Sequence, residues 1–370
     1  MERSDILIIG GGPAGSSLAH FLKDRNIDSI VIERGGPNRD KVCAGALPVA
    51  VKSILPEHLR NFKKVEYSLL ELSHKDGLKA VSSKEIVFAY GILRSEFDAY
   101  LRSGLDVRYN ERFLDYTETK DGIIARTDKG KYFAKFLVGA DGIGSRVSLV
   151  SGLAPKRRFI VAEEVEIPFK GKFDRTMKIF LGYNSPGYGW IFPKDGFLSV
   201  GSGTIRKYFR KNTVQKFHPG EYKTKIYPIS LWEKPEKLHK GQVILTGEAA
   251  NLVDPFCAGG IYPAILSSHI LSQTIEKALK SGNSEISGYE DRLEDTIYKE
   301  FRYALLLSRL FYPLLAVVKK YAVRTSTLDF ASELCSKGYV SYQKIYERAR
   351  KSKHLPLKLA CLMTKKLFKC

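Results

Sequence analysis

The first 35 residues place a strand, a glycine-rich turn, a helix and a second strand in an order that few folds accommodate. Residues 5–9 are an apolar run of strand length. Gly10, Gly12 and Gly15 follow at the G-x-G-x-x-G spacing. The first glycine permits a tight turn, the second lets the backbone approach a pyrophosphate, and the third lets the helix pack closely on the strand. A helix starting near Pro13 would direct its positive end at the phosphates, so the segment predicts dinucleotide binding.

Two further residues of this unit are expected at the nucleotide. Ala14 lies in the phosphate turn, and Glu33 ends the second strand at about the separation of an acid that accepts a hydrogen bond from the adenosine ribose. A carboxylate there would repel a 2′-phosphate, so NADPH is a poor occupant of this site. The alternative, a glycine-rich turn in another βαβ unit, is disfavoured by the order of strand, turn, helix and acid. The choice between FAD and NAD depends on later segments.

Composition narrows the class of protein. The chain has 370 residues, of which 44% are hydrophobic, and this is enough for one large core or two to three smaller ones. Its five cysteines, at 43, 257, 335, 361 and 370, match neither a disulfide framework nor a metal-ligand spacing. A reducing cytoplasm and no metal site are therefore expected. The amino terminus leaves no room for a signal peptide, and the terminal Cys370 lacks the residues that prenylation requires.

The charge balance indicates an anionic partner. Sixty Lys and Arg against forty Asp and Glu give a net charge of +20. No zinc finger, RNP motif or basic helix-turn-helix pattern accompanies this charge, so nucleic acid is not expected. Anionic lipid headgroups or diphosphates explain it equally well, and solubility alone is the remaining explanation. The longest apolar stretch, 303–318, contains Arg309 and Pro313 and is shorter than the ~20 residues of a spanning helix, which favours a buried or interfacial helix.

Later motifs identify the dinucleotide. Residues 241–275 contain a short strand, the turn Gly-Glu-Ala-Ala at 247–250 and a Gly-Gly-Ile start to an apolar helix. The sequence GADGIGSRVS occupies 139–148, and L-R-x-x-F-D-x-x-L occupies 93–101. Together with the first glycine motif, these segments resemble the FAD-dependent family that includes aromatic hydroxylases. The cofactor implied by this resemblance is FAD.

A narrower resemblance is to the geranylgeranyl reductases. It depends on K-V-C-A-G-A-L at 41–47, similar to the cysteine loop of that family, and Y-G-W-I-F-P-K at 188–194, similar to its Y-x-W-x-F-P-K signature. The resemblance spans residues 5 to about 275 and implies a flavoprotein oxidoreductase of lipid biosynthesis. Its substrate would be a geranylgeranyl chain on a prenyl diphosphate or a glycerophospholipid.

The resemblance also implies a mixed α/β (α+β) fold. A discontinuous Rossmann-like FAD-binding domain is expected from residues 1–58, 92–150 and 238–280. Alternating and aromatic runs in 59–91 and 151–237 predict an antiparallel substrate-binding sheet. Residues 281–370 are expected to form a basic helical region, whose last helix would either lie on a membrane surface or pack on the protein. On that helix Leu359, Met363 and Leu367 share one side and Lys358, Lys365 and Lys369 another.

Several expected flavin contacts follow from matching positions. Glu248 stands where the family usually has an aspartate that binds the ribityl hydroxyls. Gly260 and Ile261 match a helix start whose N–H groups face the pyrimidine edge of the flavin, where negative charge collects on reduction.

Three more positions are expected beside the cofactor. Arg94 matches a FAD-contacting arginine, with a surface salt bridge as the alternative. Phe113, by its spacing from Arg94, falls where the family backbone touches adenine. Asp141 is expected to hold the strand-to-turn geometry beside the cofactor, with a purely structural role as the alternative.

Cys43 is the candidate catalytic residue. The resemblance brings its loop near the flavin together with Ala44 and Ala46, at positions where the family is richer in glycine. A thiol with an unperturbed pKa of about 8.5 is mostly protonated at neutral pH and can donate a proton. The alternative is that Cys43 only lines the pocket.

Tyr188, Trp190 and Phe192 alternate, so on a strand they share one face. Such aromatic ladders are often plain core. The resemblance instead favours a polyprenyl tunnel roofed by these three side chains. Cys257 would lie close to the same cavity.

An isolated alkene has no carbonyl to accept electrons, so hydride addition must be accompanied by proton delivery. We hypothesise that reduced FAD supplies the hydride and that Cys43 or an ordered water supplies the proton. No second dinucleotide motif is present, so the electrons are expected from visiting NADPH or from an acidic, ferredoxin-like carrier. The alternatives are a flavin monooxygenase of an apolar or aromatic substrate and a non-catalytic membrane-associated flavoprotein. The expected location is the cytoplasm, with peripheral contact at the inner face of the membrane.

Overall fold

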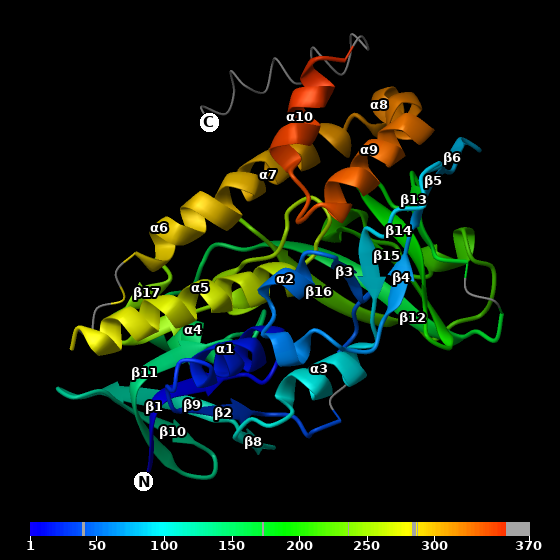
Figure 1. Ribbon diagram of the computed structural model, residues 1–370. Coiled ribbons are helices and arrows are strands. Elements are labelled where there is room, and N and C mark those ends of the chain that lie inside the picture. Colours follow the sequence, from blue (N-terminus) through cyan, green and yellow to red (C-terminus); the bar gives the residue numbers. More distant parts are fainter. Residues whose placement is uncertain (39–40, 172–173, 236, 283–285, 287, 353–370) are drawn as a thin grey trace.

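The computed structural model describes residues 1–38, 41–171, 174–235, 237–282, 286 and 288–352 (Figure 1). The predicted strand, turn, helix and strand are present as β1 (Glu2–Ile9), α1 (Pro13–Lys23) and β2 (Ser29–Glu33). Gly10 has φ +107°, and a Cβ there would lie 2.5 Å from the Ala140 carbonyl oxygen. A Cβ on Gly15 would lie 1.9 Å from the Gly10 carbonyl oxygen. The first and third glycines are therefore required by the turn and by the approach of helix to strand.

An eight-stranded sheet contains this unit. Its order is β17-β18-β11-β1-β2-β8, and β10 and β9 continue from β11. Strand β1 pairs in parallel with both β2 and β11, and β11 pairs in parallel with β18. The loops that follow these parallel strands therefore meet at one edge of the sheet, where open α/β folds bind their ligands. The other strands are β8 (Val107–Tyr109), β9 (Phe113–Glu118), β10 (Ile123–Thr127), β11 (Lys131–Gly139), β17 (His239–Lys240) and β18 (Val243–Leu245).

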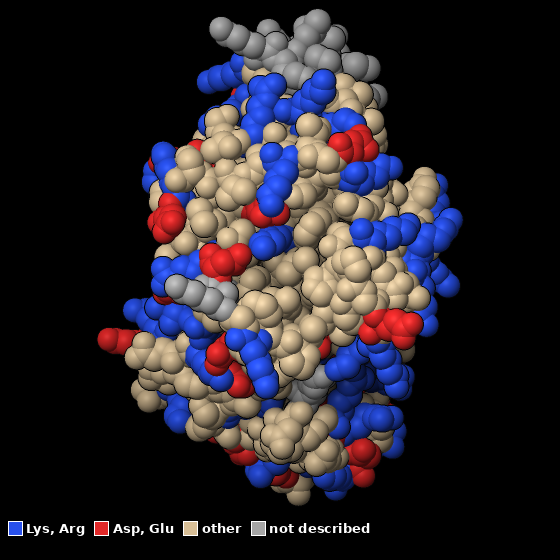
Figure 2. Space-filling model, turned by 90° about the vertical axis from the view of Figure 1, so that its right-hand side faces the viewer, with Lys and Arg blue, Asp and Glu red and all other residues tan. Residues whose placement is uncertain are grey.

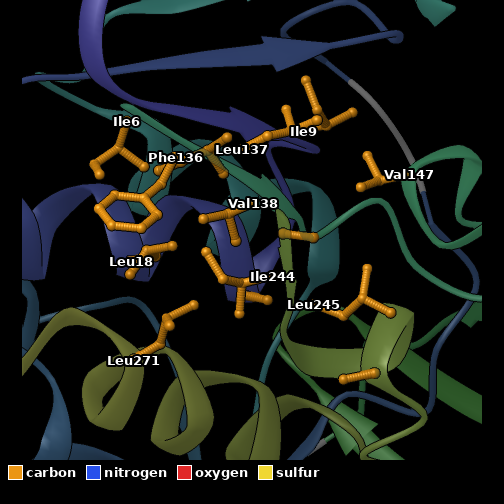
Figure 3. Close-up of a cluster of buried hydrophobic side chains, with 14 of the residues drawn as sticks. Ile6, Ile9, Leu18, Phe136, Leu137, Val138, Val147, Ile244, Leu245 and Leu271 are labelled. Carbon is orange, nitrogen blue, oxygen red and sulfur yellow. The ribbon is translucent and has the colours of Figure 1, made fainter. Parts of the chain in front are cut away.

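Helices α1 and α5 (Ile261–Lys280) pack on this sheet through a largely apolar layer. Figure 3 shows Leu18 of α1 and Leu271 of α5 beside Phe136 and Val138 of β11 and Ile244 of β18. All five side chains are almost completely buried. This core holds the first turns of both helices at the ligand edge of the sheet.

A seven-stranded sheet, on the right in Figure 1, has the order β16-β12-β15-β14-β13-β5-β6. It was expected to be antiparallel, but β5 pairs in parallel with β13, with Leu69 opposite Thr176. This pairing has a long crossover through the other sheet, which is the connection that parallel neighbours need. Its strands are β5 (Leu69–His74), β6 (Lys79–Val81), β12 (Arg158–Pro168), β13 (Thr176–Leu181), β14 (Gly187–Lys194), β15 (Phe197–Ile205) and β16 (Lys225–Leu231).

A small antiparallel sheet joins the two expected domains. Strand β7 pairs with both β3 and β4. The strands are β3 (Ala46–Pro48), β4 (Val65–Tyr67) and β7 (Ala89–Gly91). The segment after Cys43 is therefore attached to residues expected in the substrate-binding sheet, and the domain boundaries themselves stay a prediction.

The apolar stretch 303–318 is helical, as expected, but broken. It forms the end of α7 and the start of α8, with Pro313 between them. Helices α8 and α9 pack through Leu315 and Leu328 on Leu72 and Leu181 of the seven-stranded sheet. The remaining helices are α2 (Val51–Ile54), α3 (Arg94–Arg102), α4 (Arg146–Ser151), α6 (Tyr289–Leu293), α7 (Lys299–Phe311), α8 (Leu315–Ala322), α9 (Thr325–Ser336) and α10 (Tyr342–Arg350). One π-helical turn covers Glu294–Tyr298, and single 3₁₀ turns cover Glu57–Leu59, Arg206–Tyr208, Thr213–Lys216 and Gly247–Ala250.

Among the described residues, no single helix is long and apolar enough to cross a membrane. The helical segments Tyr289–Phe311 and Leu315–Ala322 pass that test of length and composition only as a pair, which is bent by 112°. The predicted helix with Leu359, Met363 and Leu367 lies outside the described residues.

Candidate functional site

One cavity of about 1710 Å³ runs from the ligand edge of the eight-stranded sheet to the space between the seven-stranded sheet and helices α7 to α9. A pocket for one small molecule usually has ~300–1,000 Å³, so this cavity has room for a dinucleotide and a second long ligand. Gly15 is buried against the turn and does not line it. The other predicted site residues line the cavity: Gly10, Gly12, Ala14, Glu33, Cys43, Ala44, Ala46, Arg94, Phe113, Asp141, Tyr188, Trp190, Phe192, Glu248, Gly260 and Ile261.

The first turn has the geometry of a phosphate and ribose site. Glu33 is 1% exposed, and its carboxylate accepts the Gly11 N–H at 2.8 Å and the Gly35 N–H at 2.8 Å. The N-cap of α1 is Gly12, which offers no side chain to its first N–H groups. These N–H groups therefore lie at the cavity ready for an anion. The donors and the close-packed glycines fit FAD at the place where the sequence predicted it.

The turn at Gly247–Ala250, which follows β18, places Glu248 at the cavity, where two basic residues contact it. Lys41 Nζ lies 3.0 Å from Glu248 Oε2. Arg157 donates to the Glu248 and Ala249 carbonyl oxygens at 3.1 and 2.9 Å. A glutamate is therefore accommodated at this position, with its carboxylate directed toward the loop that carries Cys43.

Asp141 stabilises its own turn. Its carboxylate accepts the Ser145 hydroxyl at 2.5 Å and the Arg146 N–H at 2.7 Å. Burial raises the pKa of Asp141, and these hydrogen bonds oppose that rise. These bonds support the purely structural role of Asp141 that was the alternative to a cofactor contact. The residue also borders the cavity.

Arg94 is not a surface salt bridge. It donates from Nε and Nη2 to both carboxylate oxygens of Asp98 at 2.9 and 2.8 Å, and both residues are buried. Burial disfavours the charged guanidinium, but Asp98 and Cys43 outweigh it, so the pKa of Arg94 is raised. A permanent positive charge therefore lies beside Cys43.

The cysteine loop is attached to the aromatic strand by a buried lysine. Lys194 Nζ donates to the Cys43 carbonyl oxygen at 3.2 Å and to Glu166 Oε1 at 2.8 Å. The Gly45 N–H lies 3.4 Å from Cys43 Sγ, and Gly45 has φ +69°. Lys194 ends the aromatic signature motif, and these hydrogen bonds make it the link between that motif and the cysteine loop.

Tyr188, Trp190 and Phe192 share one face of β14, as their alternation predicted. The ring centroids of Tyr188 and Trp190 are 6.0 Å apart, and those of Trp190 and Phe192 are 6.3 Å apart. Trp190 donates from Nε1 to Ser199 Oγ at 3.1 Å, and this bond leaves the rest of the indole at the cavity wall. A role in binding substrate stays a prediction for these three residues.

Four tyrosine hydroxyls hold the loop at residues 254–257, between β18 and α5. Three of the tyrosines were not predicted from the sequence, and the fourth, Tyr188, was predicted only as a wall of the substrate tunnel. Asp254 is 0% exposed, and its Oδ1 accepts the Phe256 and Cys257 N–H groups at 2.7 and 3.0 Å. Its Oδ2 accepts the hydroxyls of Tyr339 and Tyr342 at 2.5 and 2.7 Å. Tyr188 donates to the Cys257 carbonyl oxygen at 2.6 Å and Tyr312 to that of Phe256 at 2.9 Å.

Tyr339 and Tyr342 remain donors because burial, together with the Asp254 carboxylate, raises the pKa of both hydroxyls well above the ordinary value. They attach the carboxyl-terminal helices to the loop that leads into Gly260 and Ile261. No pattern in the sequence connects these residues, because 85 positions separate Asp254 from Tyr339.

Within the described ranges, no group of three or more His, Cys, Asp and Glu side chains could hold a metal ion.

Comparison with known proteins identifies the cofactor. Residues 3–48 match the FAD binding domain family, which confirms FAD as the cofactor. The chain is 27% identical to a geranylgeranyl diphosphate reductase of Oryza sativa, over 92% of this chain and 80% of that protein. It is 26% identical to a digeranylgeranylglycerophospholipid reductase of Methanocaldococcus jannaschii, over 83% of this chain and 85% of the relative.

A solved structure has the same fold. It is a geranylgeranyl bacteriochlorophyll reductase-like protein of Thermoplasma acidophilum, with a TM-score of 0.79 and 21% identity, and the match covers 97% of this chain and 98% of that one. The mixed α/β fold is thereby confirmed. The chain is an FAD-binding protein, and its predicted resemblance to the geranylgeranyl reductases holds over most of its length.

Proposed function

We propose that this protein is an FAD-dependent oxidoreductase that reduces the double bonds of geranylgeranyl chains on isoprenoid lipids or diphosphates. One observation carries the proposal. The same cavity contains the dinucleotide-binding turns at one end and a long apolar chamber at the other. The names of the relatives at 26 and 27% identity support the same substrate class.

The chamber suits a prenyl chain because its walls are apolar on both sides. The sheet contributes Leu70, Leu72, Met177, Ile179 and Leu181, and the helices contribute Leu307, Leu310, Phe311, Val318 and Leu328. Burying apolar surface is worth roughly 25 cal/mol per Å², so a long hydrocarbon gains substantial binding energy here. The same walls exclude bulk water from the reacting alkene.

Bound and reduced FAD supplies hydride chemistry to this cavity. Cys43 is the proposed proton donor: it lines the same cavity, and the bond from Lys194 to its carbonyl supports a fixed position of its loop. Trp190 and Phe192 border the space in which the alkene would lie. Positioning of this kind, with water excluded, is the contribution that the protein has to make.

Mass spectrometry under anaerobic conditions tests the proposal. FAD-loaded protein reduced with dithionite should add two hydrogens to each reduced double bond of geranylgeranyl diphosphate or digeranylgeranylglycerol phosphate. Absence of any mass change with both lipids would refute the proposal. A product that forms only with oxygen and gains an oxygen atom would indicate a monooxygenase instead.

The proposal includes an electron donor and a membrane contact. Lys and Arg cover much of the face shown in Figure 2, around an area of uncharged surface, and the chain carries a net charge of +20. An acidic electron carrier would be steered to such a surface, and its rate of electron transfer should fall steeply with salt. A rate that is insensitive to salt would favour NADPH as the donor.

Helix α8 supports contact with the inner face of the cytoplasmic membrane. Leu314 and Val317 are exposed large hydrophobic residues, and Lys319 and Lys320 follow them. Flotation with vesicles of anionic phospholipid tests this part, and failure to float with them would contradict it.

A further inference from the structure

Trp190, on the cavity wall, is seated on the neighbouring strand of its sheet. In the register of β14 with β15, Trp190 lies opposite Gly201 and Phe192 lies opposite Ser199. A Cβ on Gly201 would lie 2.2 Å from Trp190 Cζ2, so the indole occupies the space that a side chain would need there. Trp190 Nε1 donates to Ser199 Oγ at 3.1 Å. A glycine and a serine on one face of β15 thus form the seat of this indole.

Ser199 joins this seat to a buried carboxylate on the next strand. The residue is 0% exposed, and its hydroxyl donates to Glu164 Oε1 of β12. A serine hydroxyl has one proton and two lone pairs. Because the proton is directed at the carboxylate, a lone pair remains for the Trp190 N–H. The bond to Glu164 therefore fixes the orientation of the hydroxyl, and the hydroxyl fixes the indole.

The same carboxylate oxygen lies near the attachment of the cysteine loop. Glu164 Oε1 is 4.0 Å from Lys194 Nζ, which donates to the Cys43 carbonyl oxygen at 3.2 Å. Trp190 and Cys43 line the described cavity, whereas Ser199, Glu164 and Lys194 lie behind its wall. These buried polar groups therefore connect the aromatic wall of the cavity with the loop of the proposed proton donor.

We propose that Ser199 is a positioning residue for the reduction, because it fixes the Trp190 indole and with it the wall against which the alkene would lie. This inference rests on the proposed function and adds the residue that holds the wall. Ser199 does not touch the substrate and acts through Trp190. A misplacement of about 1 Å can cost about 10²-fold in rate, so a buried hydrogen bond behind the wall is sufficient for such a role.

The kinetics of Ser199→Ala test the proposal. The FAD-loaded protein is reduced with dithionite and assayed anaerobically with geranylgeranyl diphosphate. Alanine leaves the Trp190 N–H buried without this acceptor, which should lower kcat about tenfold. The KM should change by less than about twofold, because the apolar walls that bind the chain are intact. A rise in KM at unchanged kcat, or no change in either, overturns the positioning role.

Ser202 provides a matched control on the same strand. It is also 0% exposed, accepts a hydrogen bond from Asn184 Nδ2 at 3.2 Å and donates to Glu163 Oε1 at 3.3 Å. The alternation of a strand places it on the opposite face from Ser199. Ser202→Ala should therefore lose a similar amount of stability in urea unfolding and leave kcat unchanged. A fall in kcat as large as that of Ser199→Ala would overturn the proposal, because a weakened strand would then explain both.

A double-mutant cycle shows whether Ser199 acts through Trp190. Trp190→Phe keeps an aromatic ring but removes the N–H that Ser199 accepts. In this background Ser199→Ala should lower kcat by less than about twofold, because the interaction is already lost. An equal fall in kcat in both backgrounds would contradict action through the indole.

Fluorine NMR of the FAD-loaded protein reads the indole without any reaction. The chain has two tryptophans, Trp190 and Trp232, so labelling with fluorotryptophan gives one resonance for each, assigned with Trp190→Phe. Ser199→Ala should shift or broaden the Trp190 resonance and leave that of Trp232 in place, and Ser202→Ala should move neither. If no lipid is reduced, the proposed function fails, and this spectrum still decides whether Ser199 holds the indole. An unmoved Trp190 resonance in Ser199→Ala overturns the inference.

Discussion

Replacing Tyr339 and Tyr342 by phenylalanine should destabilise the protein and weaken its hold on FAD. Asp254 is 0% exposed, and its Oδ2 has these two hydroxyls as donors, at 2.5 and 2.7 Å. Phenylalanine keeps the ring, so the change removes the hydrogen bonds with little change in packing. A hydrogen bond to a charged group contributes about 1.5–3 kcal/mol, so each single variant should lose about 2 kcal/mol of unfolding free energy.

The double variant should lose at least twice that amount, because it removes both tyrosine donors from the same buried oxygen, Oδ2. The loss in FAD affinity has the same origin, since the Asp254 loop leads into the helix start at Gly260 and Ile261. Urea unfolding of the FAD-loaded protein measures the first effect, with the m-value as a check on two-state behaviour. Titration of the apoprotein with FAD measures the second.

Tyr298 provides a matched control. It is 2% exposed, and its hydroxyl has no hydrogen-bond partner among the described residues. Tyr298→Phe should therefore be neutral or slightly stabilising. If Tyr339→Phe and Tyr342→Phe fall within about 0.5 kcal/mol of Tyr298→Phe, the assignment of these hydroxyls as stabilising donors is wrong.

Three other predictions concern the first helix and the cysteine loop. Gly15→Ala should lower the free energy of unfolding by about 1–3 kcal/mol and lower the FAD retained after desalting, because its Cβ would meet the Gly10 carbonyl oxygen at 1.9 Å. Gly144→Ala, whose Cβ meets nothing within 4 Å, is the control. Equal FAD retention in the two variants would disprove the steric argument. Cys43→Ala should slow prenyl reduction by roughly 10²–10⁴-fold without changing FAD content if its thiol is the proton donor; an unchanged rate would assign the proton to water. Burial lowers the pKa of His20 from 6.5 to about 4, so the stability that neutral His20 contributes is complete above pH 6.5 and is lost as the pH falls toward 4, by about 3 kcal/mol. Unfolding measured across that range should show a smaller slope for His20→Gln, and an identical slope would contradict the linkage.

The sequence motifs predicted those parts of the site whose residues lie close together in the chain. The glycines at 10, 12 and 15 and the acid at 33 act through backbone geometry within one βαβ unit, so their spacing was sufficient. The alternation of Tyr188, Trp190 and Phe192 was sufficient in the same way, because the period of a strand determines which side chains share a face.

Other features depended on which segments meet in space. The parallel pairing of β5 with β13 was missed because the runs in 59–91 and 151–237 indicate strands but carry no information about direction. Lys194 gained a role only when the fold brought it to the Cys43 carbonyl. The surface salt bridge that was the alternative role of Arg94 is excluded for the same reason, because the fold buries both Arg94 and Asp98.

The sequence by itself determined the dinucleotide-binding turn, because a pyrophosphate needs glycines and helix N–H groups at a spacing that lies within one short segment. The resemblance carried by the later motifs then indicated FAD as the dinucleotide. The shape of the chamber, the attachment of Tyr339 and Tyr342 to Asp254 and that of Lys194 to the Cys43 carbonyl were decided by the tertiary structure alone. These hydrogen bonds join positions separated by 85, 88 and 151 residues, and their geometry depends on how two sheets and the helices α7 to α10 pack together.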